Sequence, residues 1–451
     1  MKAIARLGEF VADARPPDEA RTRAATAVLD TVGVTLAGAS EPAGRIVQAM
    51  VVGEGGAACS VFGSSGRASA SGAALANGTA AHALDFDDMC FVSLAHPSAP
   101  LVSALLAAGE LEGLAGSAVL DAYVVGFEIE ARLGRLMNPR HYQRGWHCTS
   151  TLGTLGAAAA VSRLMGLDSS TAAQALAIAA SEASGLKENF GTMVKPLHAG
   201  LAARNGIHAG LLARGGLTSS TLALDGPQGF LRAMDSEQHS LADAIEDLGR
   251  RWEVLETGIT VKLYPSCAGT HPSLDAILDL RRREQFVAED VEQIDVDVDS
   301  ITPTILIHER PSSGLEGKFS MPFCAAAAAG LGRVDLETFD SATLSNPVVM
   351  RLMPRVAMRV DPSLDGLAEP LTQARVSIRL RDGRVLTQRA NGARGYPAQP
   401  ATDTELDAKF LTCARRTLPE KSAATALEML RTFEKIKDVR VLTAALVRGG
   451  V

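Results

Sequence analysis

Four short segments of the sequence place a histidine, a lysine or a cysteine near the predicted start of a helix. His96 precedes a Ser-Ala-Pro helix start at residues 98–100, and His147 precedes an Ala-rich helix that Thr149 or Ser150 would cap. The first turn of a helix has unpaired N–H groups and a partial positive charge, which together bind carboxylates or phosphates. These two segments therefore indicate an anion site with histidines beside it.

The other two segments carry a lysine and a cysteine. Lys195 stands before Pro196, which suits the first helical position, so we expect Lys195 at the entry of that helix. Cys267 and His271 precede a further helix, with Lys262 upstream of both. If the four helix starts converge, they form a pocket for two or three carboxylates in which His and Asp side chains move protons.

The stretch His-Ala-Leu-Asp-Phe-Asp-Asp at residues 82–88 adds carboxylates to this set. Proton transfer next to a substrate carboxylate needs a base with a pKa near neutrality. It also needs a second group that protonates a leaving hydroxyl or returns a proton on the opposite face. Asp85, His96, His147 and Lys195 have the side chains that such chemistry uses.

The same residues also have structural interpretations. A lone His near a helix start is more often a capping or surface residue. Asp85, Asp87 and Asp88 could bind magnesium or form a solvated loop, and since no HExxH or further acidic motif accompanies them, we predict no metal. Cys267 is either a nucleophile activated by the helix start and Lys262, or a small buried residue.

Helical periodicity extends from about residue 17 to 250, and small residues in the helices allow close packing. His198 and His208 lie ten residues apart on one predicted helix, a spacing more typical of structural residues. Residues 53–72 predict a loop with one short strand at 60–62. The predicted helices cover residues 19–37, 98–112, 118–135, 150–165, 170–184 and 196–214.

The pattern changes after about residue 260. Strands are predicted at 294–298, 356–360 and 376–387, the last broken by an Asp-Gly hairpin turn, with helices at 272–283 and 321–330 between them. Helical periodicity returns from residue 403. We therefore predict a mainly α fold with an α+β second domain: a helical domain from residues 1–260, an α+β domain from 261–397, and helices from 398–451 that return to the first domain.

Composition excludes several classes of protein. The 451 residues carry a net charge of -7 from charges of mixed sign, which gives no footprint for nucleic acid or an anionic membrane. The six cysteines are scattered, so we expect free thiols in a reducing cytoplasm and no iron–sulfur cluster. Charges interrupt the N-terminal segment and every longer apolar stretch, so we expect a soluble, cytoplasmic protein without a transmembrane helix.

The motifs resemble those of the MmgE/PrpD family, whose members include 2-methylcitrate dehydratase, cis-aconitate decarboxylase and iminodisuccinate epimerase. The resemblance covers nearly the whole chain. It implies a large helical domain formed by both chain ends, a smaller α+β domain, a homodimer, and a cofactor-free pocket between the domains. The matching stretches are residues 77–78, 82–88, 96–98, 145–147, 195–198, 262–271 and 318–320.

Within the family, Asp85, His96, His147 and Lys195 match polar pocket residues expected in the decarboxylases. Met89 stands where those enzymes are expected to have a Thr. Cys267 likewise stands where a His is expected. The resemblance therefore favours dehydration or epimerisation over decarboxylation.

Other stretches look closer to the epimerase, namely residues 141–147, 189–193 and 265–267. In that interpretation Tyr142 and Lys262 are the two opposed proton-transfer groups, and Cys267 is a further catalytic candidate. We assign Met89, His198 and His271 to substrate binding.

We therefore predict a cofactor-independent lyase that acts on a small di- or tricarboxylate by α-proton abstraction, similar to 2-methylcitrate dehydratase. The alternative is an epimerase of an iminodisuccinate-like dicarboxylate. An alternative of another class is a non-catalytic helical binding or scaffold protein. The expected partners are the polycarboxylate and a second copy of the chain.

Overall fold

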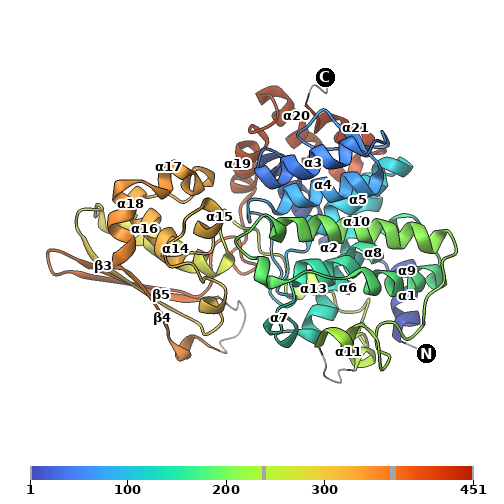
Figure 1. The fold of residues 1–451 in the computed structure, drawn as a ribbon, viewed down its shortest axis with the longest axis horizontal. Coiled ribbons are helices and arrows are strands. Elements are labelled where there is room, and N and C mark those ends of the chain that lie inside the picture. The colour runs from blue at the N-terminus through green and yellow to red at the C-terminus, as the bar shows by residue number, and fades with distance from the viewer. Residues whose placement is uncertain (1–2, 236–239, 366–371, 449–451) are drawn as a thin grey trace. The chain divides into compact units, whose positions relative to one another are not determined.

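The computed structural model describes residues 3–235, 240–365 and 372–448 of the chain. It divides into two compact units, one made of Met1–Val261 with Thr402–Val451 and the other of Lys262–Ala401 (Figure 1). The first unit is helical and is formed by both chain ends, and the second combines helices with a sheet. The predicted fold class is confirmed.

The first unit buries its longest helices against one another. Helix α10 packs on α4 and α8, α6 packs on α8, and the C-terminal α19 packs on α2. The elements of this unit are α1 (Ala3–Asp13), α2 (Asp18–Gly38), α3 (Pro42–Gly53), β1 (Cys59–Ser60), β2 (Arg67–Ala68), α4 (Ala70–His82), α5 (Ser98–Glu112), α6 (Gly116–Met137), α7 (Arg140–Gln143), α8 (Cys148–Leu164), α9 (Ser169–Glu182), α10 (Val194–Arg214), α11 (Phe230–Asp235), α12 (Leu241–Ala244), α13 (Glu253–Glu256), α19 (Asp403–Ala414), α20 (Glu420–Arg431) and α21 (Arg440–Ala445).

Small residues allow α4, α5 and α10 to approach closely. Ala81, Ala99 and Ala199, one from each helix, form a fully buried cluster. A Cβ atom added at Gly78 of α4 would lie 2.9 Å from the Cα of Gly200 on α10. Helices α4 and α10 therefore meet almost backbone to backbone, beside the ends that carry the candidate site residues, and α5 packs against both.

Helix α4 is absent from the sequence-based prediction, which placed a loop over residues 53–72. Its residues are buried on every side except at Ser71, so the polar face that reveals an amphipathic helix is missing. The loop prediction is therefore wrong at its end, where α4 begins at Ala70. The predicted strand at 60–62 is displaced as well, because β1 ends at Ser60.

The second unit contains a four-stranded sheet in the order β4-β3-β5-β6. Strands β3 and β4 are parallel, whereas β5 is antiparallel to both β3 and β6. The elements are α14 (His271–Glu284), β3 (Val291–Val298), α15 (Gly314–Gly317), α16 (Met321–Leu331), α17 (Ser341–Leu344), α18 (Pro347–Leu352), β4 (Val356–Val360), β5 (Ala374–Leu380) and β6 (Val385–Ala390).

Alternating side chains explain this sheet. In β3 the residues Ile294, Val296 and Val298 are fully buried, and the acidic residues between them point to the other face. Helix α14 packs on β5 and β6 and α16 packs on β4, so the helices cover one face (Figure 1). The predicted hairpin is confirmed, with Gly383 at a positive φ of 91° in its turn.

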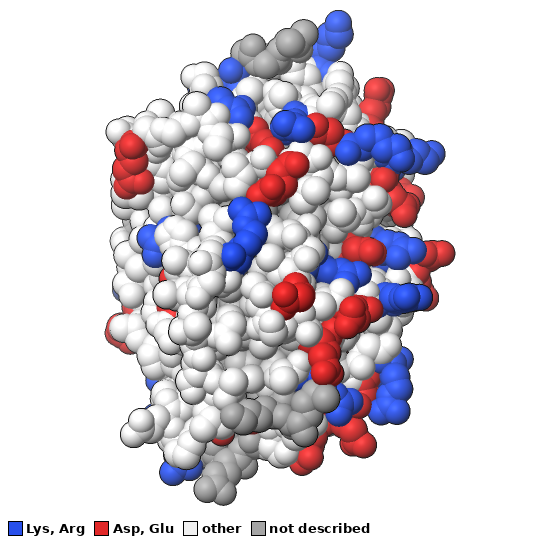
Figure 2. Space-filling model, turned by 90° about the vertical axis from the view of Figure 1, so that its right-hand side faces the viewer, with Lys and Arg blue, Asp and Glu red and all other residues white. Residues whose placement is uncertain are grey.

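The surface agrees with the mixed charge of the sequence. Figure 2 shows one face on which acidic and basic side chains alternate along one side, next to a broad uncharged area. Within the described residues, no helix has the length and apolar character needed to cross a bilayer. The six cysteines are buried free thiols.

Candidate active site

The loop between α4 and α5 carries the acidic motif, and two other helices hold its backbone in place. Asp85 has a positive φ of 52°, a conformation that Asp tolerates better than most residues. The Lys409 ammonium on α19 donates a hydrogen bond to the Phe86 carbonyl oxygen at 2.8 Å and lies 2.6 Å from a carboxylate oxygen of Asp30 on α2. The returning C-terminal helix therefore fixes the loop that presents the carboxylates.

Asp87 in this loop is fully buried and faces two imidazole rings with one oxygen. Its Oδ2 lies 2.7 Å from Nδ1 of His82, the last residue of α4, and 3.3 Å from Nδ1 of His96. Burial opposes ionisation of this carboxyl, but the two imidazoles hold its pKa well below the usual range. Asp87 is therefore an ionised carboxylate that orients both rings.

His82 is the neutral partner of that carboxylate. Burial lowers the pKa of His82 to about 3, although Asp87 acts in the opposite direction. Its Nδ1 lies within hydrogen-bond distance of Asp87, and among the described residues its buried Nε2 has no hydrogen-bond partner. The ring lies edge-on to His96 at 4.5 Å and stacks on His147 at 5.6 Å between centroids.

His96 lies just before α5, as predicted. Its backbone N–H donates to Oγ1 of Thr149 on α8 at 3.0 Å, which ties the residue to a second helix. While Nδ1 faces Asp87, Nε2 lies 3.8 Å from Oδ1 of Asp85. The two ring nitrogens of His96 therefore face two different carboxylates.

Lys195 and Asp85 form a buried ion pair, with side chains 6% and 5% exposed. The Lys195 ammonium contacts Oδ1 of Asp85 and lies 5.7 Å from the ring centroid of Phe190. Helix α10 begins at Val194, so Lys195 stands inside its first turn and the predicted start at Pro196 is wrong by two residues. Pro196 is tolerated there because the first N–H groups of a helix have no intrahelical partner.

His147 and His198 join α8 to α10 through their rings. Their Nδ1 atoms lie 3.0 Å apart, so one ring donates its proton to the other. Burial, and then the charge of Lys195, lowers the pKa of His198 to about 4. The pKa of His147 is held well below its usual range, mainly by burial and then by the neighbouring His82, Lys195 and His198. Both rings are therefore neutral near pH 7.

The start of α8 corrects one prediction. The helix begins at Cys148, so His147 is itself the N-cap residue, and the predicted caps Thr149 and Ser150 lie inside the first turn. The His147 side chain makes no capping hydrogen bond and is directed to His198 instead. The Ser150 hydroxyl donates a hydrogen bond to the His198 carbonyl oxygen at 3.2 Å, which is a second contact between α8 and α10.

Two further predicted residues lie at the edge of this cluster. The Phe190 ring packs between two rings: its centroid lies 6.5 Å from that of Tyr142 and 4.9 Å from that of His147. The Lys187 ammonium lies 3.6 Å from the centroid of the Tyr142 ring. Met89 follows the acidic loop and pairs through its backbone with Thr260.

Asp88 faces away from the histidines, toward the start of α5. Its carboxyl accepts a hydrogen bond from the Ser98 backbone N–H at 3.2 Å and contacts the Ser98 hydroxyl, which lies 2.6 Å from the Tyr123 hydroxyl. Burial raises the pKa of Asp88 to about 8. Burial, and then Asp88, also holds the pKa of Glu130 well above its usual range. Asp88 and Glu130 are therefore protonated, uncharged carboxyl groups outside the histidine cluster.

The cluster combines groups that bind anions with groups that move protons. Atoms of His82, Asp85, Asp87 and His96 lie within 4.8 Å of one another, which meets the spacing of a metal site. However, the ammonium of Lys195 already contacts Asp85, and a second cation beside it would be repelled. The arrangement therefore suits a substrate carboxylate next to Lys195 better than a metal ion.

Lys262, Cys267 and His271 belong to the second unit. The Lys262 side chain is fully buried, and the Cys267 backbone N–H donates to the Lys318 carbonyl oxygen at 3.0 Å. The Lys318 ammonium in turn donates to the Pro265 carbonyl oxygen at 2.7 Å, so this buried lysine holds the loop in shape. Cys267 precedes a 3₁₀ turn, Ala268–Thr270, and His271 is the first residue of α14 rather than a residue before it.

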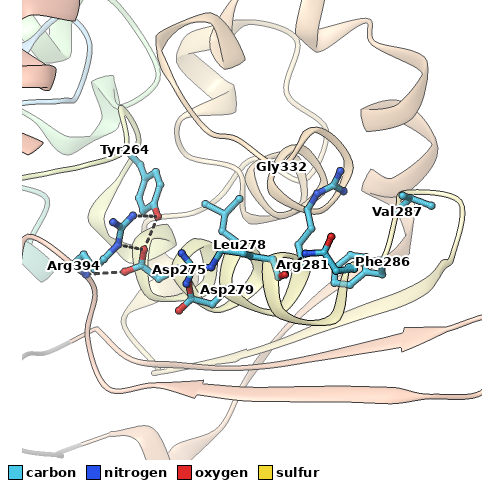
Figure 3. A pocket seen from close by; sticks show the side chains of 11 residues that line it. Tyr264, Asp275, Leu278, Asp279, Arg281, Phe286, Val287, Gly332 and Arg394 are labelled. Atoms are coloured by element: carbon cyan, nitrogen blue, oxygen red, sulfur yellow. Dashed lines mark hydrogen bonds and ion pairs between the residues drawn. The ribbon is translucent and has the colours of Figure 1, made fainter.

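A surface pocket of about 650 Å³ also lies in the second unit, along α14 (Figure 3). The Tyr264 hydroxyl donates to Oδ1 of Asp275 at 2.5 Å, and Arg394 donates to both residues. The predicted site residues are not among those that line it. Its polar groups largely satisfy one another, so it is less suited to chemistry than the buried cluster.

Sequence reasoning quoted the motif at residues 82–88 but assigned a role only to Asp85. His82 and Asp87 were missed, although both lie at the centre of the cluster. The sequence did contain one indication of their role. His82 is followed within six residues by three aspartates, and a turn in this segment allows the imidazole to contact one of their carboxylates. Because α4 was not predicted, nothing indicated that its last residue would face the site.

Two family models and several known proteins match most of the chain. The model of the MmgE/PrpD N-terminal domain matches residues 5–241, and that of the C-terminal domain matches residues 264–435. Cis-aconitate decarboxylase of Mus musculus is 28% identical, over 83% of this chain and 78% of its own. The cis-aconitate decarboxylase-like protein oryM of Aspergillus oryzae is 27% identical, over 98% of this chain and 96% of its own. Cis-aconitate decarboxylase of Aspergillus terreus is 26% identical, over 95% and 92% respectively.

Proposed function

The chain belongs to the MmgE/PrpD family, and on that premise we propose that it is a cofactor-independent lyase acting on a small tricarboxylate or dicarboxylate. The reaction begins with proton transfer at the carbon next to a substrate carboxylate. One observation carries this proposal: Nε2 of His96 and the ammonium of Lys195 both face Oδ1 of Asp85. The imidazole of His96, as a base, and the buried ammonium of Lys195 thus lie near the same carboxylate oxygen.

In this proposal, Lys195 binds a substrate carboxylate and His96 takes the α-proton. A buried ammonium next to the reacting carbon stabilises the charge that develops on the carboxylate as the proton leaves. The neutral rings of His147 and His198 carry an N–H that can donate to a second carboxylate or to a leaving hydroxyl.

Loss of water from a substrate similar to 2-methylcitrate is the leading reaction. Decarboxylation of cis-aconitate is the second candidate, because the relatives compared above carry that name. Epimerisation of an iminodisuccinate-like dicarboxylate is the third, with Tyr142 and Lys262 as its proposed proton-transfer groups. Each of these reactions transfers a proton at carbon but leaves a different product.

One experiment in deuterated water separates the three reactions. The protein is incubated in turn with 2-methylcitrate, cis-aconitate and iminodisuccinate, and the products are followed by proton NMR. A new alkene from 2-methylcitrate means dehydration. A product of cis-aconitate that has lost one carboxylate and carries deuterium at carbon means decarboxylation. Deuterium at the carbon of iminodisuccinate without an alkene means epimerisation. If none of the substrates changes, the proposed substrate class is wrong.

A non-catalytic scaffold is the remaining alternative, and two variants test it. His147→Ala and Lys195→Ala should each abolish turnover if the chain is an enzyme that uses this cluster. A scaffold would show no turnover to lose and would keep its binding partner in both variants.

The homodimer that the resemblance implies is a separate proposal. The exposed apolar residues Leu186, Met193 and Val194, which lie just before α10 or at its start, give one surface on which a second copy could pack. Light scattering after size exclusion measures the mass in solution. A mass of one chain at micromolar concentration would reject the dimer.

A further inference from the structure

Asp87 contacts two histidines through a single oxygen, and neither contact involves Asp85 or Lys195. Oδ2 lies 2.7 Å from Nδ1 of His82 and 3.3 Å from Nδ1 of His96. The other oxygen, Oδ1, is buried and has no hydrogen-bond partner among the described residues. The carboxylate of Asp87 therefore presents one oxygen to both rings.

The direction of these contacts determines where the ring protons lie. An ionised carboxylate only accepts hydrogen bonds, so each imidazole that faces it through Nδ1 carries its proton on that atom. In a neutral ring the opposite nitrogen, Nε2, is then unprotonated. For His96 this unprotonated Nε2 is the atom on the side of Asp85 and Lys195.

We propose that Asp87 is a positioning residue that fixes His96, and His82 with it, in the Nδ1–H form, so that Nε2 of His96 is presented to the substrate as the base. This inference rests on the proposed function only for the identity of the proton that His96 removes. The arrangement of ring protons is a property of the free protein and is measurable without a substrate.

Further titratable groups around this pair come from the same loop and from α2, α8 and α10. Asp85 and Asp88 stand in the loop, and Asp30 on α2 interacts electrostatically with Asp87. His147 lies at the start of α8, and Lys195 and His198 lie on α10. Of these, Asp85 faces the opposite nitrogen of His96. Asp87 is thus the group placed to hold the Nδ1 proton.

The first test uses the wild-type protein. With 15N-labelled histidine, long-range proton–nitrogen correlation spectra report which nitrogen of each ring carries the proton, and His82→Gln and His96→Gln assign the two rings. The proposal expects Nδ1–H for both rings. An Nε2–H form for either ring in the free protein overturns it, whether or not the protein turns over any substrate.

The second test replaces Asp87 by Asn, which keeps the shape of the side chain but adds an N–H donor. We expect His96 to shift toward the Nε2–H form. In Ser-His-Asp triads the equivalent change lowers kcat by about 10⁴-fold, and we expect a loss on the order of 10²- to 10⁴-fold here, with KM altered less. Loss of the negative charge also weakens the base, so the acid limb of the kcat/KM profile moves to lower pH.

A matched control is Glu110→Gln, which also removes a buried carboxylate. Glu110 binds Ser60 and Arg67 near the far end of α5, roughly 18 Å along the helix from Ser98. This variant should leave the ring protons and the pH profile unchanged. If Asp87→Asn leaves the His96 spectrum and the pH profile unchanged, Asp87 has no positioning role. If the spectra agree with the proposal and no polycarboxylate reacts, the positioning role stands and the proposed function fails.

Discussion

The ammonium of Lys195 lies against one carboxylate oxygen of Asp85, and both side chains are almost completely buried in the first unit. Removing one partner of such a pair leaves an uncompensated buried charge. Lys195→Met should therefore lower the free energy of unfolding by about 3–5 kcal/mol. The double variant with Asp85→Asn should lose less than the sum of the two single variants, because no charge is left alone.

Urea denaturation of the four proteins in this cycle measures the coupling. Arg333→Met provides the comparison, since Arg333 pairs with Asp335 on the surface and its loss should cost about 0–1 kcal/mol. Strict additivity of the two buried substitutions would contradict the pairing of Lys195 with Asp85.

Proton uptake should accompany binding of the polycarboxylate. His82, His147 and His198 are neutral in the free protein because burial lowers the pKa of each ring. Incoming carboxylates favour the protonated rings, so the complex takes up protons near neutral pH. Calorimetry with cis-aconitate in buffers that differ in ionisation enthalpy measures their number. Release of protons, or none exchanged, would be inconsistent with neutral rings beside the ligand, and His198→Gln should reduce the uptake.

Asp88 makes the stability of the first unit depend on pH. Burial raises the pKa of its carboxyl to about 8 in the folded protein, against about 3.9 in an unfolded chain. The folded state therefore keeps a proton that the unfolded state releases. Its contribution is complete below about pH 4 and is lost as the pH rises through about 8, at up to about 1.4 kcal/mol per pH unit.

Asp88→Asn imitates the protonated carboxyl and removes this dependence. Between about pH 5 and pH 8, the free energy of unfolding should fall more steeply for the wild type than for the variant. Urea denaturation across that range gives both slopes. The histidines titrate in both proteins, and Asp88 contributes to the raised pKa of Glu130, so the difference in slope reports Asp88 together with its effect on Glu130. Parallel slopes would show that Asp88 is ionised when folded.

Chelation should leave the protein unchanged. Although Asp87 and three side chains around it have the spacing of a metal site, the Lys195 ammonium already contacts Asp85 and would repel a second cation there. Dialysis against EDTA should therefore alter neither the melting temperature nor the turnover of a polycarboxylate. Activity that disappears on dialysis and returns with a divalent ion would reverse this assignment.

Periodicity in the sequence predicted the elements that have both a buried and an exposed face. Strands β3 and β5 alternate in this way. Helices α5 and α8 are buried on nearly every side, and they were predicted from the residues at their starts. Helix α4 was missed because its Ala, Ser, Gly, Asn and Thr residues continue the composition of the loop before it, and its N-cap Ser69 was assigned to that loop.

The candidate site shows the same division. Helix starts led to His96, His147 and Lys195, which the fold brings into one cluster with Asp85. The shared oxygen of Asp87 could not be predicted, because it depends on the angle between the end of α4 and the loop that follows. The side-chain directions at a helix end are set by tertiary packing, and spacing along the chain does not encode them.

The close contact of α4 with α10 links the packing of the first unit to the cluster. A Cβ atom at Gly200 would lie 2.3 Å from the Leu75 carbonyl oxygen and 2.3 Å from Oγ1 of Thr79, so the two helices must separate. Gly200→Ala should lower the free energy of unfolding by about 1–3 kcal/mol, despite the better helix propensity of Ala.

The separation also moves His82, at the end of α4, relative to His198 on α10. Because displacement of reacting groups by about 1 Å can cost on the order of 10²-fold in rate, turnover should fall more than stability alone explains. Gly53→Ala is the control, since no atom lies within 4 Å of its added Cβ. The melting temperature and kcat are measured for both variants. If Gly200→Ala and Gly53→Ala lower kcat equally, the α4–α10 contact does not position the cluster.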